Sequence, residues 1–444
     1  MENLSRPQER ACVGEHLADG ECCAVVGLSN TGKSALLRGL CTLEGRPPTL
    51  NEETASFFYI DCNRMLDLSE QGFYEAILRA VRARLREMAA PQELMERLEQ
   101  AYRDVVEPRN PLAIPLGFND GMERLCEAGR RVVFLLDEFD EPFGALEGRI
   151  FLNLRALRDR YREGLVYVTA TARALEEVRN DPETAEFREL FAGRVCMLGM
   201  LKETEAREVI ARMATEEGFS LSKQEVHFIA RAAGGHPGLL RGIARLLIRA
   251  QAAAPQTYER MGVSLVEEAL TGDQVVRGEC DRLWAQLTPV EQDGLLALSR
   301  GEALAREERE HLHRLGLVNA DGAIFGTAFA AFVRQWGQRR PDLPRGVWLD
   351  EDAGEVYVDG RRIPVLTDLE YRLLQVLYRR MDKLCDKYRL VEEVWGESYI
   401  DEVDDARIEK LVSRVRAKVE ENPADPRYLI TVRGRGYRLL SRPK

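Results

Sequence analysis

Eight residues, G-L-S-N-T-G-K-S at 27 to 34, have the composition and spacing of a phosphate-binding loop. Glycines 27 and 32 let the backbone turn closely, so that its N–H groups can surround phosphate oxygens. Lys33 is expected to neutralise the terminal phosphates, and Ser34 to coordinate Mg²⁺. The residues of this loop expected to bind a nucleotide are Gly27, Asn30, Thr31, Gly32, Lys33 and Ser34.

A second motif, R-V-V-F-L-L-D-E-F-D at 131 to 140, supplies carboxylates. Its apolar residues 132 to 136 are typical of a parallel strand buried on both faces. Asp137 ends that strand, at the position where open α/β sheets bind ligands. We expect Asp137 to bind Mg²⁺ through the outer coordination shell of the ion. We expect Glu138 to orient or deprotonate the attacking water.

Four other apolar runs, 21–26, 56–62, 164–173 and 194–201, predict the remaining strands of a sheet. Between the runs, apolar residues recur at helical spacing, for instance Phe73, Ile77, Val81 and Leu85. This alternation predicts a doubly wound α/β domain with a parallel sheet.

The end of the run 164–173 carries two polar candidates, Thr171 and Arg173, that could sense the terminal phosphate. A surface arginine after a strand is the alternative for Arg173. The chain has no [NT]-K-x-D guanine motif, so the expected nucleotides are ATP and ADP.

Composition restricts the class of protein. With 45% hydrophobic and 31% charged residues, the chain resembles an ordinary soluble protein of several domains. No run approaches the ~18 apolar residues needed to span a bilayer, and the start lacks the order of a secretory signal. We therefore expect a cytoplasmic protein without a membrane partner. The nine cysteines show no C-x-x-C pair or zinc spacing, which predicts small core residues in a reducing compartment.

After residue 202 the apolar spacing is helical, interrupted by G-G-H-P at 234 to 237. Proline is favourable in a first helical turn, which alone could explain Pro237. The phosphate-binding loop, the D-E-x-D acids at 137 to 140, a T-x-R-like strand end and this G-x-P element together resemble the STAND branch of AAA+-related ATPases. The resemblance covers roughly residues 20 to 340. It implies that Pro237 packs against the base of the nucleotide and reports its state to a helical lid.

The same resemblance predicts three domains: an NTPase domain at 1–201, the lid at 202–275 and a small winged helix at 276–340. The last segment reads as three short helices and a strand hairpin that turns at Asp321-Gly322. The family often has a histidine there that contacts the β-phosphate. His311 and His313 are the candidates, although the M-H-D sequence is missing. The N-terminal G-R-E element of the family has only R-P-Q-E-R, residues 6 to 10, in its place.

The charge of the chain is segregated toward its C-terminal end. Residues 407–444 contain eleven Lys and Arg against four Asp and Glu, a net +7, which leaves −18 on the rest. Such asymmetry is expected of a nucleic-acid-binding segment on an acidic body, although a solvated basic end would have the same composition. Residues 337–346 have the composition of a linker.

Beyond the linker, residues 347 to 365 predict a small antiparallel sheet, and helices follow at 367–380, 383–397 and 404–421. In the third helix the residues Ile408, Leu411, Val412, Val415 and Val419 form one apolar face. The residues expected on the opposite face and its flanks to contact DNA are Arg407, Lys410, Ser413, Arg414 and Arg416. An ordinary solvated surface helix would show the same distribution of apolar and basic residues around its axis.

Residues 426 to 440, P-R-Y-L-I-T-V-R-G-R-G-Y-R-L-L, read as two strands joined through Gly434-Arg435-Gly436. Residues 347–441 closely resemble the OmpR/PhoB-type winged helix of response regulators, and a domain at 347–444 is expected. The resemblance implies that the third helix enters the major groove of double-stranded DNA. It also implies that the wing, with Arg433 and Arg435, reaches the backbone or the minor groove.

These features predict a multidomain chain: a P-loop NTPase, a lid, a small winged helix and a DNA-binding winged helix. We expect a transcriptional regulator whose ADP form is closed and monomeric and whose ATP form assembles as a homo-oligomer on DNA, with weak turnover and an unknown inducer. One alternative is an ATPase that loads on DNA with little sequence preference, as an initiator does. Another is a defence-type STAND sensor, but no repeat array is visible.

Overall fold

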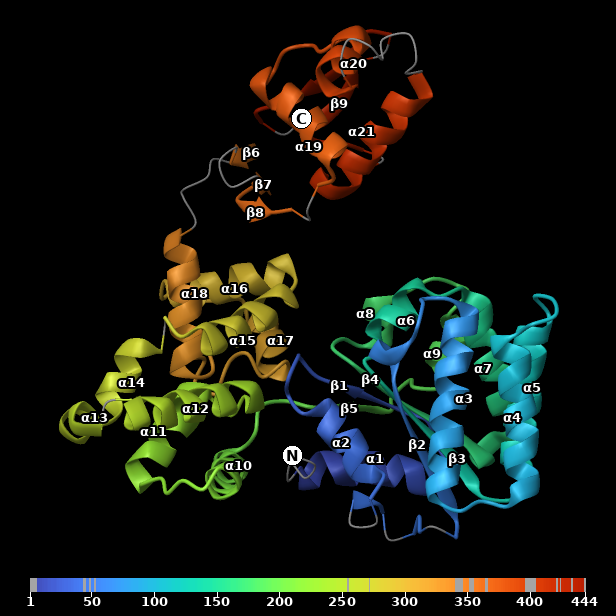
Figure 1. Cartoon of the computed structure of the whole chain (residues 1–444). Coiled ribbons are helices and arrows are strands. Elements are labelled where there is room, and N and C mark those ends of the chain that lie inside the picture. Colours follow the sequence, from blue (N-terminus) through green and yellow to red (C-terminus); the bar gives the residue numbers. More distant parts are fainter. Residues whose placement is uncertain are drawn as a thin grey trace. The chain divides into compact units, whose positions relative to one another are not determined.

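The computed structural model divides the chain into two compact units, residues 1–334 and residues 335–444 (Figure 1). The residues that the structure describes are 6–42, 45–47, 49–51, 53–253, 255–270, 272–339, 346–350, 355–363, 366–395, 405–420, 422–423, 425–432 and 434–442. The second unit has a hydrophobic core of its own. Within these described ranges no helix is both long enough and apolar enough to cross a bilayer.

The first unit contains a five-stranded parallel sheet with the strand order β2-β3-β4-β1-β5. The strands are β1 (Cys23–Val26), β2 (Ala55–Asp61), β3 (Arg131–Asp137), β4 (Leu165–Thr171) and β5 (Val195–Met197). Each predicted apolar run forms one of them, so the predicted parallel sheet is confirmed. Because the strands are parallel, the loops that follow β1, β3 and β4 lie at one edge of the sheet.

The centre of the sheet is fully buried, as the run in β3 predicts. Residues 132 to 136 are each at most 1% exposed. Burying side chains of this size contributes roughly 1.5–3 kcal/mol each. The apolar core therefore holds the ends of β3 and β4 in fixed positions.

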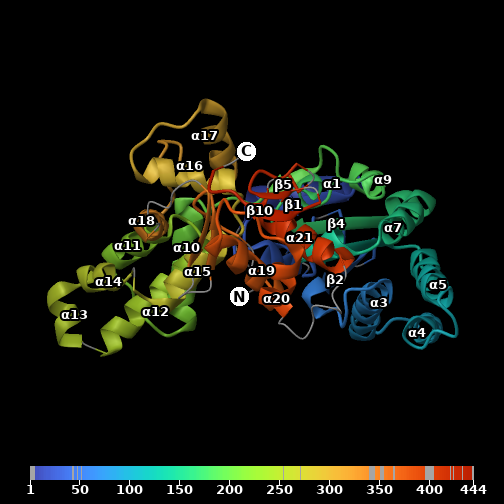
Figure 2. The same cartoon turned by 90° about the horizontal axis from the view of Figure 1, so that it is seen from above.

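Helices surround this sheet. They are α1 (Pro7–Ala18), α2 (Lys33–Leu40), α3 (Glu70–Glu87), α4 (Gln92–Val106), α5 (Ala113–Glu127), α6 (Asp140–Ala145), α7 (Gly148–Tyr161), α8 (Leu175–Val178) and α9 (Ala185–Glu189), with short 3₁₀ turns at Cys62–Arg64 and Arg162–Gly164. Helix α3 begins after Ser69, whose hydroxyl accepts the Gly72 N–H at 3.0 Å. In both views α3, α4 and α5 stand together beside β2 (Figures 1 and 2).

The expectation that every cysteine is a free thiol is wrong for one pair. Cys12 of α1 and Cys196 of β5 form a disulfide across 184 residues, and the other seven cysteines are free. Sequence spacing could not reveal this pair, because the fold brings α1 beside an edge strand that forms much later in the chain. His16, one turn after Cys12 on α1, lies next to the two sulfur atoms.

In the described chain from residue 203 to 339 the regular elements are helices, apart from one short bridge. Its helices are α10 (Glu203–Glu216), α11 (Lys223–Ala233), α12 (Pro237–Ala253), α13 (Pro255–Met261), α14 (Val263–Ala269), α15 (Gln274–Ala285), α16 (Pro289–Ser299), α17 (Arg306–Arg314) and α18 (Thr327–Arg339). The hairpin expected at Asp321-Gly322 is reduced to a single antiparallel bridge between Val318 and Ile324.

Helix α18 was absent from the sequence prediction. Its aromatic residues favour a strand by propensity, but tertiary packing decides for a helix. Phe325 stacks on Phe329 with ring centroids 4.9 Å apart, and Phe329 on Phe332 at 5.9 Å. The three-residue spacing places Phe329 and Phe332 on one face of α18, and Phe325, just before the helix, packs against the same face.

The second unit combines small antiparallel sheets with three helices, as predicted. Its elements are β6 (Val347–Asp350), β7 (Glu355–Val358), β8 (Arg361–Arg362), α19 (Asp368–Arg379), α20 (Lys387–Trp395), α21 (Asp405–Val419), β9 (Leu429–Val432) and β10 (Gly436–Leu439). Strands β6, β7 and β8 form one sheet, and β9 pairs with β10.

Candidate nucleotide site and candidate DNA interface

The loop after β1 folds as its glycines suggest. Gly27 donates its N–H to the Thr171 carbonyl at 3.1 Å, and a Cβ on Gly27 would lie 2.6 Å from the Leu198 carbonyl oxygen. Gly32 has φ 108°, a left-handed conformation that favours glycine. Asn30 has φ 56°, which asparagine tolerates better than most residues. The loop thus leads into the N-terminus of α2, where helix amides favour an anion.

Lys33 and Thr31 fold back onto this loop. Lys33 Nζ donates to the carbonyls of Gly27 and Leu28 at 2.7 and 3.2 Å, and Thr31 Oγ1 donates to the Leu28 carbonyl at 2.7 Å. Burial lowers the pKa of Lys33, and the nearby carboxylates, Glu138 first, oppose that shift. The ammonium group of Lys33 therefore lies inside the loop, close to Glu138, which follows β3.

Two carboxylates at the end of β3 have different surroundings. Asp137 is buried and accepts hydrogen bonds from Tyr59 Oη at 2.5 Å and from the Glu138 N–H at 3.1 Å. Glu138 is half-buried with φ 52°. Burial raises the pKa of the Glu138 carboxyl, and Lys33 opposes that shift.

The side chains at this edge fit a magnesium ion by the chemistry of their donors. Ser34 and Asp137 offer hydroxyl and carboxylate oxygens, which Mg²⁺ prefers. Both Asp137 oxygens already accept a hydrogen bond, so this carboxylate suits the outer coordination shell of an ion better than direct ligation.

A cavity of about 400 Å³ lies beside the loop and is lined from two parts of the first unit. The lining residues that come from the loop, from α2 and from the position after β3 are Asn30, Gly32, Lys33, Ser34, Ala35, Arg38 and Glu138. The helices from residue 203 to the end of the first unit at residue 334 are called the helical part. The lining residues that come from it are Val209, Arg212, Met213, Glu216, Pro237 and Arg241. The volume lies within the range of small-molecule sites. The sequence candidates Gly27, Thr31, Asp137, Thr171 and Arg173 lie outside this lining.

The contribution of α10 to the cavity was missed from the sequence. Residues 209, 212, 213 and 216 share one face of this helix because their spacings are three and four. The periodicity predicts α10, but the same helix also buries a second apolar face that includes Ile210. Only the packing shows which face is turned to the loop.

His236 and Pro237 join the helical part to the phosphate-binding loop. His236 Nε2 lies 2.9 Å from the Ser29 carbonyl, and His236 Nδ1 accepts the Leu239 N–H at 3.1 Å. The imidazole is therefore neutral with its hydrogen on Nε2. Burial lowers its pKa to about 4. Pro237 begins α12 and lines the cavity. Its contact with the base of a nucleotide stays a prediction.

Arg6 contacts the phosphate-binding loop, which the sequence did not predict. Its side chain is fully buried, and Nη2 donates to the Thr31 carbonyl at 2.6 Å. Nη1 donates to Glu9 Oε1 at 3.1 Å. The segment R-P-Q-E-R therefore packs against the loop despite its departure from the G-R-E pattern.

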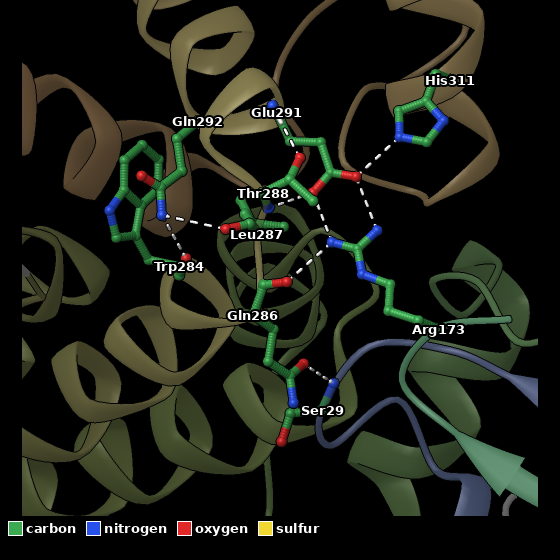
Figure 3. Close-up of polar contacts among 9 residues, drawn as sticks. All are labelled: Ser29, Arg173, Trp284, Gln286, Leu287, Thr288, Glu291, Gln292 and His311. Carbon is green, nitrogen blue, oxygen red and sulfur yellow. Dashed lines mark hydrogen bonds and ion pairs between the residues drawn. The ribbon is translucent and has the colours of Figure 1, made fainter. Parts of the chain in front are cut away.

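Thr171 and Arg173, at the end of β4 and just after it, form their polar contacts outside the cavity. Thr171 Oγ1 donates to the Arg173 carbonyl at 2.6 Å. The Arg173 guanidinium forms an ion pair with Glu291 of α16 (Figure 3). His311 also contacts Glu291, at 2.8 Å, and His313 Nδ1 lies 2.8 Å from the Val318 carbonyl. Neither histidine lines the cavity.

In the second unit, helix α21 has the two faces predicted from its sequence. Its five predicted apolar residues are each at most 4% exposed. The predicted contact residues Arg407, Lys410, Ser413 and Arg414 are exposed. This surface is basic and polar, with one small hydroxyl residue, and suits contact with phosphates and base edges.

Arg416 differs from the other predicted contact residues. Its Nε donates to the Leu429 carbonyl and its Nη2 to Thr431 Oγ1, both at 2.8 Å. It is half-buried, and burial lowers its pKa. Arg416 therefore braces α21 against β9, the first strand of the wing.

The wing is fixed by one glycine. Gly436 has φ 131°, and a Cβ there would lie 2.1 Å from the Cys385 carbonyl oxygen. Cys385 pairs with Tyr437 through backbone hydrogen bonds at 2.9 Å. Arg435 is exposed in the turn between β9 and β10. Arg433, the other wing residue named from the sequence, lies outside the described residues.

Comparisons with curated proteins find regulators of gene expression or signalling. The chain is 35% identical over 89 residues to the "Probable transcriptional regulator ycf27" of Cyanophora paradoxa, covering 20% of this chain and 37% of that protein. It is 38% identical over 93 residues to the "Sensory transduction protein RegX3" of Mycolicibacterium smegmatis, covering 21% and 40%. The matched segments thus span less than two thirds of these relatives.

Similar solved structures include an ATPase and a DNA-binding domain. The Walker-type ATPase PABY2304 of Pyrococcus abyssi aligns with TM-score 0.44 and 15% identity, over 81% of this chain and 94% of that one. The RstA DNA-binding domain of Klebsiella pneumoniae, solved with the RstA box, aligns with TM-score 0.20 and 24% identity, over 22% and 92%.

Two family models match the chain. The model described as "Transcriptional regulatory protein, C terminal" matches residues 361–439. The model described as "Novel STAND NTPase 1" matches residues 4–298, more than half of the chain. The chain therefore belongs to the novel STAND NTPase 1 family, and its NTPase is fused to a C-terminal DNA-binding domain of the OmpR/PhoB type.

Proposed function

We propose that this protein is a transcriptional regulator in which bound ATP or ADP controls assembly into a homo-oligomer and engagement of DNA. The observation that carries the proposal is the cavity lined both by the phosphate-binding loop and by α10 and α12. A ligand bound there contacts both parts at once. It can therefore favour one arrangement over another to the extent that its contacts differ between them.

The site geometry supports the following roles toward the nucleotide. Lys33 and the amides at the start of α2 bind the phosphates, with Asn30, Thr31 and Gly32 shaping the loop. Ser34 would coordinate Mg²⁺ directly and Asp137 through the outer coordination shell, and the ion would screen phosphate charge. Glu138 orients the attacking water, and Pro237 contacts the base. The pKa of the Glu138 carboxyl, which burial raises, supports its assignment as the group that accepts a proton from water.

The DNA roles belong to the second unit. The exposed face of α21 supports its placement in the major groove. The residues proposed to contact DNA are Arg407, Lys410, Ser413, Arg414, Arg433 and Arg435. Because Arg416 is bound to β9, we assign it to positioning the wing, with at most a phosphate contact from its remaining donors. Assembly would let several such domains bind repeated half-sites, which raises affinity without new contacts.

The test is binding of the purified full-length protein to DNA at fixed salt. The probes are the intergenic DNA upstream of its own gene and random DNA, each with ADP and with a non-hydrolysable ATP analogue. Selective binding that appears or tightens with the ATP analogue is the expected result. Light scattering of the same samples measures whether assembly accompanies binding.

A different result would favour the main alternative. Equal affinity for both DNAs, together with DNA-stimulated hydrolysis when ATP is supplied, is the behaviour of an ATPase that loads on DNA. Nucleotide binding with no effect on either DNA affinity or assembly would contradict both functions.

A further inference from the structure

The guanidinium group of Arg173 is held by an acidic residue of the helical part (Figure 3). Nη1 donates to Glu291 Oε1 at 2.7 Å, while Nη2 donates to Glu291 Oε2 at 2.5 Å and to the Gln286 carbonyl at 2.8 Å. The Arg173 side chain is 13% exposed and that of Glu291 only 2%. A paired, charge-assisted contact of this kind is among the strong polar interactions in proteins.

The carboxylate of Glu291 has further partners. Oε2 accepts the Thr288 N–H at 2.7 Å, as the capping group of α16, and Oε1 lies 2.8 Å from His311 Nε2 (Figure 3). Burial acts to raise the pKa of Glu291, but the hydrogen bonds from Arg173 and His311 hold it below the ordinary value. The carboxylate is thus charged, almost fully buried and dependent on Arg173 for its main counter-charge.

Gln286 connects this pair to the phosphate-binding loop. Its carbonyl accepts from Arg173, while its side-chain Oε1 accepts the Ser29 N–H at 2.7 Å (Figure 3). The segment between α15 and α16 is braced by Gln292, whose Nε2 donates to the Trp284 carbonyl at 3.0 Å. Movement of α16 would therefore disturb both Arg173 and the loop. We call Arg173, Gln286, Glu291 and His311 the latch.

An arginine can offer its paired donors to only one anion at a time. The planar fork that binds a carboxylate has the same geometry that binds a phosphate. Arg173 follows Thr171, whose carbonyl accepts the Gly27 N–H of the phosphate-binding loop. We propose that Glu291 occupies Arg173 in place of the terminal phosphate of ATP and so holds α15 and α16 against the loop until ATP takes the arginine. This inference rests on the proposed function and deepens it by naming how the same site is regulated.

The test compares nucleotide affinities of the full chain and of Glu291→Gln. Glutamine keeps an oxygen for the Thr288 N–H but removes the charge that competes with phosphate. The affinity for a non-hydrolysable ATP analogue should rise at least about tenfold relative to that for ADP, since a charge-assisted contact is typically lost. Without nucleotide, amide hydrogen exchange at residues 28–31 and 284–292 should become faster.

A second pair of variants assigns the effect to Arg173. Arg173→Gln should abolish the preference for the ATP analogue. Glu291→Gln should then have no further effect on the ratio of affinities when added to Arg173→Gln, because the two residues act through one contact. A rise of the ratio in the double variant equal to that in Glu291→Gln would overturn the proposal.

Glu225→Gln is a matched control. Glu225 is also a largely buried capping glutamate, at the start of α11, and its Oε2 accepts the Ser222 N–H at 2.6 Å. The control should lose some stability but keep the parent ratio of affinities. If Glu291→Gln unfolds, Glu291→Asp keeps the charge but is too short for the paired contact, and it should shift the ratio in the same direction.

Failure of the latch and failure of the proposed function give different results. An unchanged affinity ratio and unchanged exchange in the Glu291 variants, in a protein whose parent shows ATP-dependent DNA binding, contradict the latch alone. A parent that binds both nucleotides without any change in DNA binding contradicts the proposed function, whatever the Glu291 variants do.

Discussion

The candidate nucleotide site and the candidate DNA surface use charge in opposite ways. In the first unit Lys33, Asp137 and Glu291 are buried and each has a specific partner. In the second unit Lys410 and Arg414 are exposed on α21, and Arg414 forms a long ion pair with Glu370, at 3.8 Å. A buried charge is costly without a partner, so exchanging its partner changes the structure around it. An exposed charge can meet a polyanion with little rearrangement. Buried, partnered charges therefore suit a conformational switch, and exposed charges suit a surface that binds DNA.

The largest expected effect is on hydrolysis. Glu138→Gln removes the group assigned to activating water, and turnover should fall by about 10²–10⁴-fold. Binding of ATP should persist, so the variant should remain in the ATP form on DNA. Phosphate release and DNA binding measure the two properties. Parent-like turnover would remove Glu138 from the mechanism.

Loss of the buried lysine should act on binding itself. Lys33→Ala removes the ammonium group that lies inside the loop, and the Kd for ATP should rise by at least about 100-fold. Titration with a fluorescent nucleotide measures it. Lys202→Ala, which removes an exposed lysine bonded to Gln8, should bind ATP like the parent. Equal increases of the Kd for ATP in the two variants would mean that the buried position of Lys33 does not contribute to ATP binding.

The buried histidine predicts a pH dependence of the stability of the first unit. The folded pKa of His236 is about 4, below the ordinary 6.5. Between these values the unfolded chain binds more protons, so stability decreases as pH falls below about 6.5. The loss approaches roughly 3 kcal/mol near pH 4. Urea unfolding of the parent and of His236→Gln across pH 4.5 to 7.5 measures this part, which should be absent from the variant. Identical pH profiles would contradict it.

Exposed basic residues should affect DNA affinity without affecting nucleotide affinity. Lys410→Ala or Arg414→Ala should weaken DNA binding by about 1–3 kcal/mol if the side chain contacts a base. A phosphate contact would instead reduce the salt dependence of binding. Titrations at several salt concentrations separate these cases. If neither variant changes DNA affinity, α21 is not the recognition helix.

The smallest expected effect sharpens the comparison within the second unit. Arg416→Ala removes two hydrogen bonds to β9, which should lower the free energy of unfolding by about 1–2 kcal/mol. Lys410→Ala, on the exposed face, should stay within about 0.5 kcal/mol of the parent. Urea unfolding measures both. Equal stabilities would show that the hydrogen bonds from Arg416 to β9 do not stabilise the second unit.

Local patterns predicted the elements that carry the chemistry. The five strands, the loop with Lys33 and the apolar face of α21 follow from short-range spacing, because each depends on residues within one or two turns. The contacts between distant segments did not follow. Arg6 reaches the Thr31 carbonyl and Arg173 reaches Glu291 only after the chain has folded. Spacing shows neither which face of α10 turns inward nor which arginine has a buried carboxylate as its partner.

The disulfide between Cys12 and Cys196 has a mechanical consequence. It fastens the edge strand β5 to α1, and the chain leaves for α10 only a few residues later. A force that pulls α10 away from the sheet would act first on β5. The disulfide would transmit this force to α1, so that the hydrogen bonds between β5 and β1 would not break. Any rotation of the helical part would then be confined to the segment after Leu198, whose N–H donates to the Val26 carbonyl of β1 at 2.6 Å. The crosslink would thus keep such a rotation at the border of the sheet, and reducing it would let the rotation extend into β5.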